Sequence, residues 1–297
     1  MFKPNYNFNP NINWTILSKN PNAVHILECN HNDIDWYYLS LNPHLDAIYL
    51  IENNLDKINW GWLSSNPNAV NLLEKRISNI DWGELSFNPN AIDLLEKNMY
   101  HIDWLSLSGN PNAIHLLEQN IYNVNWAMLS ENPNAIHILE QNTDKIYWRI
   151  LSMNPNAIRL IEQNLDKIDW FLLSGNPNAI HILEQNPDKI YWSYLSSNPN
   201  AIHLIEENLD KVDWNELCTN PNAVYLLEKN FDKINWWYLC KNPDAIHLLA
   251  TLDCDKMREQ CKEFASELLA YVLHPTRLIR LAASLDMDLE EYMELLI

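Results

Sequence analysis

Residues 104–125 read WLSLSGNPNAIHLLEQNIYNVN, and Trp126 begins the same pattern again. The consensus is W-x-x-L-S-x-N-P-N-A-I-x-L-L-E-x-N-x-D-K-I-D, with a period of 22 residues. Eleven tryptophans begin a unit: Trp14, Trp36, Trp60, Trp82, Trp104, Trp126, Trp148, Trp170, Trp192, Trp214 and Trp236. Every spacing is 22 residues except the one from Trp36 to Trp60, which is 24. A fixed period of this length is typical of stacked arrays, in which each unit contacts only its neighbours.

The first half of each unit predicts a short helix. We number positions from the tryptophan, so Trp at position 1 and Leu at position 4 share one helical face. The residue before the tryptophan is Asp or Asn in nine of the eleven units, and these residues favour helix N-caps. The exceptions are Tyr147 and Tyr191.

The second half of each unit predicts a second helix. Position 7 is Asn and position 8 is Pro in every unit. Asparagine before proline favours an extended N-cap, and proline at the first helical position costs no hydrogen bond. Asn at position 17 can end the helix, because asparagine tolerates the left-handed conformation. We therefore expect a hairpin of helices with roughly 6 and 10 residues, in which Asn-Pro begins the second.

The fold class that these hairpins predict is all-α: an α-solenoid of about eleven stacked helical hairpins with a helical C-terminal cap. Helices that pack about 8–10 Å apart would give a rod or superhelix on the order of 100 Å long. The alternative is a leucine-rich-repeat-like solenoid, whose period also fits. That fold requires an apolar residue at position 2, where this chain has Thr15, Gly61 and Arg149 among others.

The repeats divide the chain into three parts. Residues 1–13 are an N-terminal cap, 14–250 the repeat solenoid, and 251–297 a C-terminal helical cap, since open solenoid ends expose an apolar face. The second unit carries two extra residues within Asn42–Ile48, where we expect a local bulge without loss of register. In the C-terminal part, His274-Pro275 interrupts the helical pattern, and the sequence leaves open whether this segment docks another protein.

The composition disfavours several classes of partner. The net charge is −19, which repels nucleic acid and anionic membranes. No apolar run is long enough to span a membrane. The five cysteines are odd in number and unpatterned, which favours a reducing compartment. Only four glycines occur, so glycine-rich phosphate loops are not expected.

The recurring polar residues indicate no catalytic, cofactor-binding or metal site. Glu at position 15 recurs in ten units. A residue that nearly every unit carries is best explained by the stacking of units, with each carboxylate accepting a hydrogen bond from a backbone, Asn or indole donor. His at position 12, as in His181 and His203, recurs one unit apart, at roughly 10 Å, which is too far for two ligands of one zinc ion. The same spacing separates Cys218 from Cys240. We therefore expect no enzyme activity and no cofactor.

Positions 2, 3 and 6 vary between units, whereas the framework positions do not. Variable positions rich in aromatic residues are what a recognition surface requires. The partner-binding candidates are Tyr37, Tyr38, Trp62, Phe87, Met128, Arg149, Phe171, Tyr194, Trp237 and Tyr238. The alternative, which the sequence leaves open, is that these side chains only pack between neighbouring first helices.

The repeat unit resembles tandem repeats that are abundant in proteins of giant DNA viruses of amoebae. The match covers residues 14–250, and a shorter segment, 267–277, is similar to a C-terminal motif in such proteins. The resemblance implies an intracellular location, either the cytoplasm of an infected host cell or the virus particle, and it supplies no catalytic residues.

The function that we expect is a non-catalytic protein–protein interaction scaffold, with a protein partner and neither nucleic acid nor membrane. The alternative is a structural component of a virus particle. The sequence leaves open the identity of the partner, the hand of the superhelix and the oligomeric state.

Overall fold

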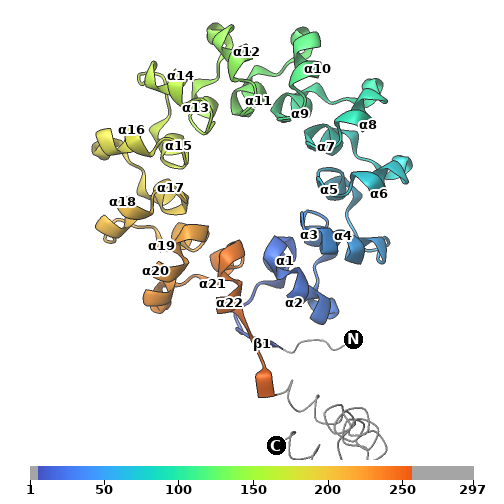
Figure 1. The fold of residues 1–297 in the computed structure, drawn as a ribbon, viewed down its shortest axis with the longest axis vertical. Helices are drawn as coiled ribbons and strands as arrows, with labels where there is room; N and C mark the ends of the chain where they lie inside the picture. The colour runs from blue at the N-terminus through green and yellow to red at the C-terminus, as the bar shows by residue number, and fades with distance from the viewer. Residues whose placement is uncertain (1–5, 256–297) are drawn as a thin grey trace, which may run out of the picture. The chain divides into compact units, whose positions relative to one another are not determined.

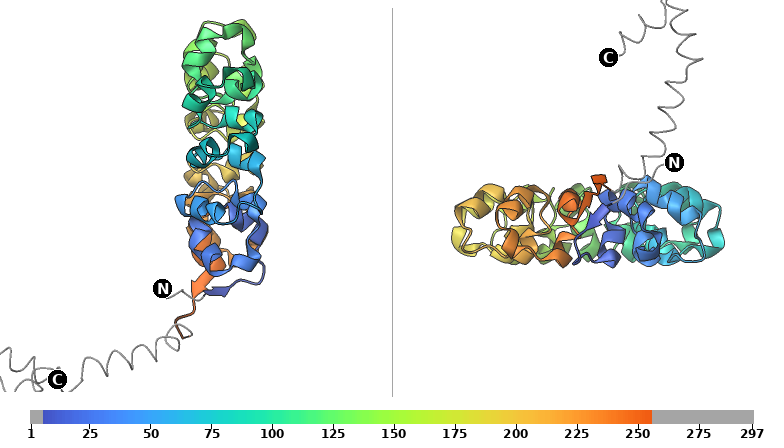
Figure 2. Two further views of the ribbon diagram at one scale, coloured as in Figure 1. Left: turned by 90° about the vertical axis from the view of Figure 1, so that its right-hand side faces the viewer. Right: turned by 90° about the horizontal axis from the view of Figure 1, so that it is seen from below.

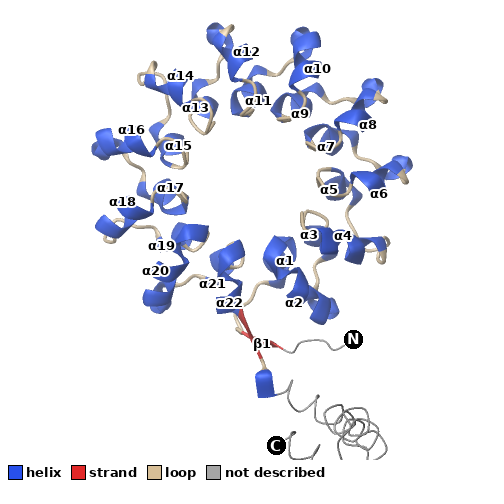
Figure 3. Cartoon of the chain, viewed as in Figure 1, coloured by secondary structure: helices blue, strands red, loops and turns tan. Residues whose placement is uncertain are grey.

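The computed structural model describes residues 6–255. Its regular secondary structure is almost entirely helical, with a pair of short helices in each unit (Figure 3). The first helices of the units are α1 (Trp14–Lys19), α3 (Trp36–Leu39), α5 (Trp60–Ser64), α7 (Trp82–Phe87), α9 (Trp104–Gly109), α11 (Trp126–Glu131), α13 (Trp148–Leu151), α15 (Trp170–Ser174), α17 (Trp192–Ser197), α19 (Trp214–Leu217) and α21 (Trp236–Leu239). The all-α solenoid is confirmed, and the leucine-rich-repeat alternative is wrong because position 2 lies in a helix.

The second helices begin three residues later than the sequence suggested. They are α2 (Val24–Cys29), α4 (Leu45–Glu52), α6 (Val70–Glu74), α8 (Ile92–Glu96), α10 (Ile114–Gln119), α12 (Ile136–Glu140), α14 (Ile158–Glu162), α16 (Ile180–Gln185), α18 (Ile202–Glu207), α20 (Val224–Lys229) and α22 (Ile246–Leu249). All except α4 begin at position 11, so the expected length of roughly 10 residues was wrong.

The Pro-Asn-Ala segment forms a tight turn instead of the first helical turn. In the fifth unit the Asn110 side chain accepts a hydrogen bond from the Asn112 amide at 3.0 Å. Ala113 then has φ −92° and ψ 9°, outside the α-helical region, so the α-helix starts only after it. In three units the turn is a 3₁₀ helix: η1 (Pro21–Ala23), η8 (Pro221–Ala223) and η10 (Pro243–Ala245).

A second turn returns the chain to the next unit. It forms a 3₁₀ helix in seven units: η2 (His31–Asp33), η3 (Ile77–Asn79), η4 (Met99–His101), η5 (Ile121–Asn123), η6 (Thr143–Lys145), η7 (Pro187–Lys189) and η9 (Phe231–Lys233). The expected left-handed Asn at position 17 was wrong. Asn120 has φ −128°, and its side chain ends the helix by donating to the Leu116 carbonyl at 2.8 Å.

The N-caps of the first helices are as expected. The Asn125 side chain accepts a hydrogen bond from the Met128 amide at 3.0 Å, and equivalent caps precede the other units that carry Asp or Asn. Tyr147 and Tyr191 provide no side-chain cap, because tyrosine is not one of the residue types that cap helix N-termini. These caps set the direction in which each first helix leaves the preceding turn.

The units form two concentric layers (Figure 1). The odd-numbered helices lie on the inner circle and the even-numbered helices on the outer one. The core lies between them: in the fifth unit Leu107, Ala113 and Leu117 are fully buried, and Leu116 nearly so. Each hairpin therefore buries its apolar residues only with the help of its neighbours.

A ladder of buried asparagines joins consecutive units. The Asn132 side chain donates to the Ser108 and Asn110 carbonyls of the previous unit, at 3.1 and 2.9 Å. The asparagines that do so are Asn20, Asn42, Asn66, Asn88, Asn110, Asn132, Asn154, Asn176, Asn198, Asn220 and Asn242. We call this set the asparagine ladder.

Serine at position 5 adds a second link between units. Ser108 is buried; its hydroxyl donates to the Trp104 carbonyl at 2.7 Å and accepts from the Asn125 amide of the next unit at 2.9 Å. In the last two units Cys218 and Cys240 replace the serine, and each thiol accepts the corresponding amide at 3.4 Å.

The repeat array closes on itself, so the expected open rod or superhelix was wrong. Figure 1 shows α21 beside α1, and Figure 2 shows the flat ring from two sides. At this seam the Asn20 side chain donates to the Cys240 and Asn242 carbonyls at 3.0 and 3.1 Å. The Asn13 amide donates to the Cys240 thiol. The seam thus repeats the contacts of every other interface between units.

The chain enters and leaves the ring at the seam. Residues 8–249 form one compact unit, which is the ring. The strands β1 (Tyr6–Phe8) and β2 (Ala250–Leu252) pair in a two-stranded sheet. The last repeat packs against the first, so its open face needs no separate cap. The C-terminal cap that we expected spans 251–297. Its first residues belong to β2, and the part from 256 onward, with His274-Pro275 and segment 267–277, lies outside the described residues.

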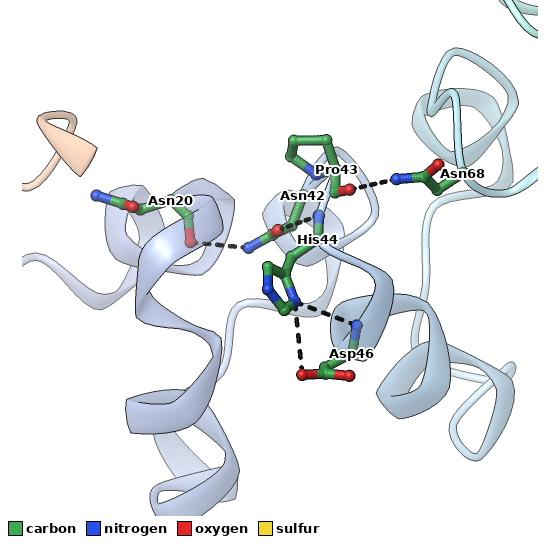
Figure 4. A network of polar contacts seen from close by, with 6 residues as sticks. All are labelled: Asn20, Asn42, Pro43, His44, Asp46 and Asn68. Atoms are coloured by element: carbon green, nitrogen blue, oxygen red, sulfur yellow. Dashed lines mark hydrogen bonds and ion pairs between the residues drawn. The ribbon is translucent and has the colours of Figure 1, made fainter. Parts of the chain in front are cut away.

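The insertion in the second unit lengthens a helix and does not form a bulge. α4 has eight residues, and the His44 side chain caps it by accepting from the Asp46 amide at 3.2 Å (Figure 4). The asparagine ladder continues on both sides, since Asn42 donates to the Asn20 carbonyl and Asn66 to the Asn42 carbonyl. The expectation that register is kept is confirmed.

Candidate functional site: the inner face of the ring

The side chains at positions 2 and 3 lie on the first helices, and those at position 6 lie at the last residue of the first helix or within two residues after it. We call the side chains at these three positions the inner face. On the fifth unit Leu107 at position 4 points into the core, and Ser108 at position 5 toward the next unit. A helix turns about 100° per residue, so in this unit positions 2 and 6, which both lie within α9, point away from the core and toward the centre of the ring. The inward side of every first helix therefore carries the variable residues.

The candidates differ in exposure. Tyr37 is 55% exposed, Phe87 45% and Trp237 42%, and Arg149 is also exposed. The remaining candidates are half-buried: Tyr38, Trp62, Met128, Phe171, Tyr194 and Tyr238. The exposed members show that solvent reaches the inner face. Among the half-buried members, Tyr38 contacts Trp62 and Phe171 contacts Tyr194 across neighbouring first helices, so both alternatives left open by the sequence describe part of this surface.

Three aromatic side chains meet between α3 and α5. The Trp62 ring lies 5.2 Å from Tyr38 and 6.5 Å from Tyr37 by ring centroids, edge-on in both cases. Edge-to-face contact is a favourable arrangement for aromatic pairs. Tyr37 remains more than half exposed, so the cluster presents a fixed aromatic surface to solvent.

Two further contacts depend on glycine at position 6. A Cβ on Gly109 would lie 3.1 Å from both Phe87 and Met128, which belong to the units on either side. A Cβ on Gly175 would lie 3.1 Å from Tyr194, whose ring contacts Phe171 at 4.1 Å. The missing side chains let large residues of neighbouring units approach each other across α9 and beside α15.

Near the seam, Trp237, Tyr238 and Lys241 form one group. The two rings lie 4.9 Å apart, and the Lys241 ammonium lies 4.0 Å from the Trp237 centroid and 4.9 Å from that of Tyr238. An ammonium over an indole face is attracted by the ring quadrupole. The sequence analysis singled out Trp237 and Tyr238. Only the structure shows that Lys241 lies over their rings.

The charges on the inner face balance. Positions 2, 3 and 6 carry three cations, Lys19, Arg149 and Lys241, and three anions, Glu84, Glu131 and Glu216. Arg149 pairs with Asp169 at 3.3 Å. The inner face is therefore formally neutral in a chain of net charge −19.

The outer surface carries paired polar residues. His115 lies 2.8 Å from Glu96, and the pairs His137–Glu118, His181–Glu162, His203–Glu184 and His247–Glu228 repeat this contact between neighbouring units. These histidines form an exposed row, and the glutamates of the preceding units pair with them. The backbone, asparagine or indole donors that we proposed for these glutamates were wrong.

Each tryptophan at position 1 is half-buried, and in most units a polar side chain lies against its ring. In six units a lysine at position 20 lies over the ring, as Lys145 does over Trp126 at 4.5 Å. In the fourth unit His101 stacks on Trp82 at 4.6 Å instead. The sequence analysis did not predict this contact. The lysine that recurs at position 20, three residues before the next tryptophan, could have indicated it.

Within residues 6–255, three groups have altered acidities. Burial raises the pKa of the Cys218 and Cys240 thiols. A hydrogen bond from the Tyr225 hydroxyl to the Glu206 carboxylate raises the pKa of Tyr225 to about 12. All three groups are thus held in their protonated forms near neutral pH.

The described residues supply no metal cluster, because nowhere in 6–255 do three His, Cys, Asp or Glu side chains gather as ligands. In the same range, no helix has the length and apolar character needed to cross a membrane.

The fold and surface define a class: a closed ring of tandem helical hairpins with a variable, neutral and aromatic inner face. None of the protein-family models, curated proteins or solved structures compared with the chain matches it.

Proposed function

We propose that the chain is a non-catalytic scaffold whose inner face binds a protein partner. The observation that carries this proposal is the contrast in charge and side-chain type. The inner face is neutral and rich in Tyr, Trp and Phe, whereas the chain as a whole has a charge of −19. Aromatic side chains are enriched at the energetic centres of protein interfaces, and charged residues are depleted there.

The partner segment that fits is uncharged and apolar. A strongly basic segment would be attracted by the outer glutamates and would find few anions on the inner face. The rigid support of the aromatic residues favours binding, since side chains already fixed by their neighbours lose little conformational entropy. The cluster of Tyr37, Tyr38 and Trp62 is held in this way.

The resemblance to repeat proteins of giant viruses is the basis for placing this scaffold in an infected cell or a virus particle. Closure of the ring argues against the alternative of a structural rod. A closed array has no free repeat face to which a further copy could add head to tail.

The test is selection of peptides from a random displayed library on the immobilised chain, followed by measurement of their affinities. We expect enriched peptides to be uncharged and to lose at least about tenfold in affinity for the variant Tyr37→Ser/Phe87→Ser/Trp237→Ser. The matched control is Tyr49→Ser/Tyr100→Ser/Tyr122→Ser, which removes three exposed aromatic residues outside positions 2, 3 and 6. Equal losses in the two variants, or no enrichment, would refute the proposal.

A further inference from the structure

A pocket of about 570 Å³ lies where the ring closes. Its residues come from the first and second units and, through Lys241, from the last unit at the other end of the repeat array. Ile16, Tyr38 and Leu41 form an apolar wall together with Pro21 and Pro43. This volume lies in the range of about 300–1,000 Å³ that is usual for small-molecule sites.

Two lysines lie at the edge of this pocket. Lys19 and Lys241 occupy the same position of adjacent units and line one pocket only because the last unit packs against the first. At this position the other units carry Leu41, Ser65, Phe87, Gly109, Glu131, Met153, Gly175, Ser197 and Thr219. The paired positive charge is therefore specific to the seam.

The two ammonium groups have no acidic partner among the described residues. Neither lysine forms an ion pair there, and no Asp or Glu lines the pocket, although the chain has 39 acidic residues. Lys241 lies over the Trp237 and Tyr238 rings, which hold its charge beside the pocket. Like charges on neighbouring side chains repel each other, and an anion between them would relieve that repulsion.

We propose that this seam pocket binds a small amphipathic carboxylate. The carboxylate would accept charge-assisted hydrogen bonds from the two lysines, and its apolar body would lie against Ile16, Tyr38 and Leu41. An inorganic anion would leave the apolar wall exposed, and a neutral apolar molecule would leave the lysines unpaired. The proposal does not depend on the protein partner, because it concerns a different ligand.

The test is isothermal titration calorimetry of the full chain with sodium octanoate, and with 1-octanol as the uncharged analogue. We expect octanoate to bind with one-to-one stoichiometry and 1-octanol to bind at least about tenfold more weakly. In the variant Lys19→Gln/Lys241→Gln, octanoate affinity should fall by a similar factor and become nearly independent of salt concentration.

The matched control is Lys75→Gln/Lys97→Gln, which changes the net charge equally at two exposed lysines outside the inner face. We expect this variant to bind octanoate like the wild type. Equal weakening in both variants would show a general charge effect and overturn the proposal. Equal affinity for octanoate and 1-octanol, or no octanoate binding, would overturn it as well.

Discussion

At the scale of single residues, the asparagine at position 7 is the most constrained side chain of the unit. Its oxygen fixes the turn within its own unit, and its nitrogen donates two hydrogen bonds to the previous unit. Asn132 is fully buried, so its partners cannot turn to water when the side chain is removed. A buried polar group without a partner costs about 1–3 kcal/mol.

Asn132→Ala should therefore lower the free energy of unfolding by about 3 kcal/mol, since it leaves two carbonyls and one amide without this partner. Denaturant unfolding followed by circular dichroism measures the change. The control is Asn134→Ala, which removes an exposed hydrogen bond to the Pro111 carbonyl and should cost less than about 1 kcal/mol. Similar values for the two variants would contradict the role of the asparagine ladder.

The buried thiols at position 5 should react slowly. Their pKa values are raised by burial, so near neutral pH less thiolate is present than at an exposed cysteine, and access is blocked as well. Treatment of the native chain with iodoacetamide, followed by mass mapping, should show Cys254 labelled well before Cys218 and Cys240. Labelling of Cys240 at the rate of Cys254 would mean that the seam is open.

At the scale of the helices, sequence patterns predicted which helices form better than where they begin. The N-caps and the core positions followed from residue type, because Asp or Asn before the tryptophan and leucines at helical spacing have few alternatives. The start of the second helix did not follow. Asn-Pro is compatible with either a helix or a tight turn, and the ladder hydrogen bonds from the neighbouring unit decide between them.

The insertion in the second unit is accommodated within α4 alone. Deletion of Leu45 and Asp46 should therefore shorten α4 to the length of its neighbours and leave the ladder contacts of Asn42 and Asn66 in place. We expect the deletion variant to retain the helical circular dichroism spectrum and a cooperative unfolding transition. Loss of cooperative unfolding would indicate that the insertion is needed to close the ring.

At the scale of the candidate site, the sequence identified the variable positions but not their surroundings. Variation at positions 2, 3 and 6 singled out Tyr37, Phe87 and Trp237, and in the structure these three side chains are exposed on the inner face. The seam pocket was beyond sequence analysis, because Lys19 and Lys241 lie at opposite ends of the array and line the same pocket only through closure.

At the scale of the whole repeat array, closure depends on a small rotation repeated eleven times. Each unit must turn by one-eleventh of a circle relative to the last, and no single residue determines that angle. A sequence signal nevertheless exists. The first unit keeps Asn20, whose side chain would have no previous unit to contact in an open array, and the last unit supplies the acceptors at Cys240 and Asn242.

The most direct test of closure is a distance measurement between the first and last units. Spin labels at Asn22→Cys and Asp244→Cys, in a background without other reactive cysteines, report it by pulsed electron paramagnetic resonance. The ring predicts the same short distance distribution as labels at Asn112→Cys and Asn134→Cys, which lie in neighbouring units. A distance of many tens of ångströms, up to the roughly 100 Å of an open stack of eleven units, would contradict it.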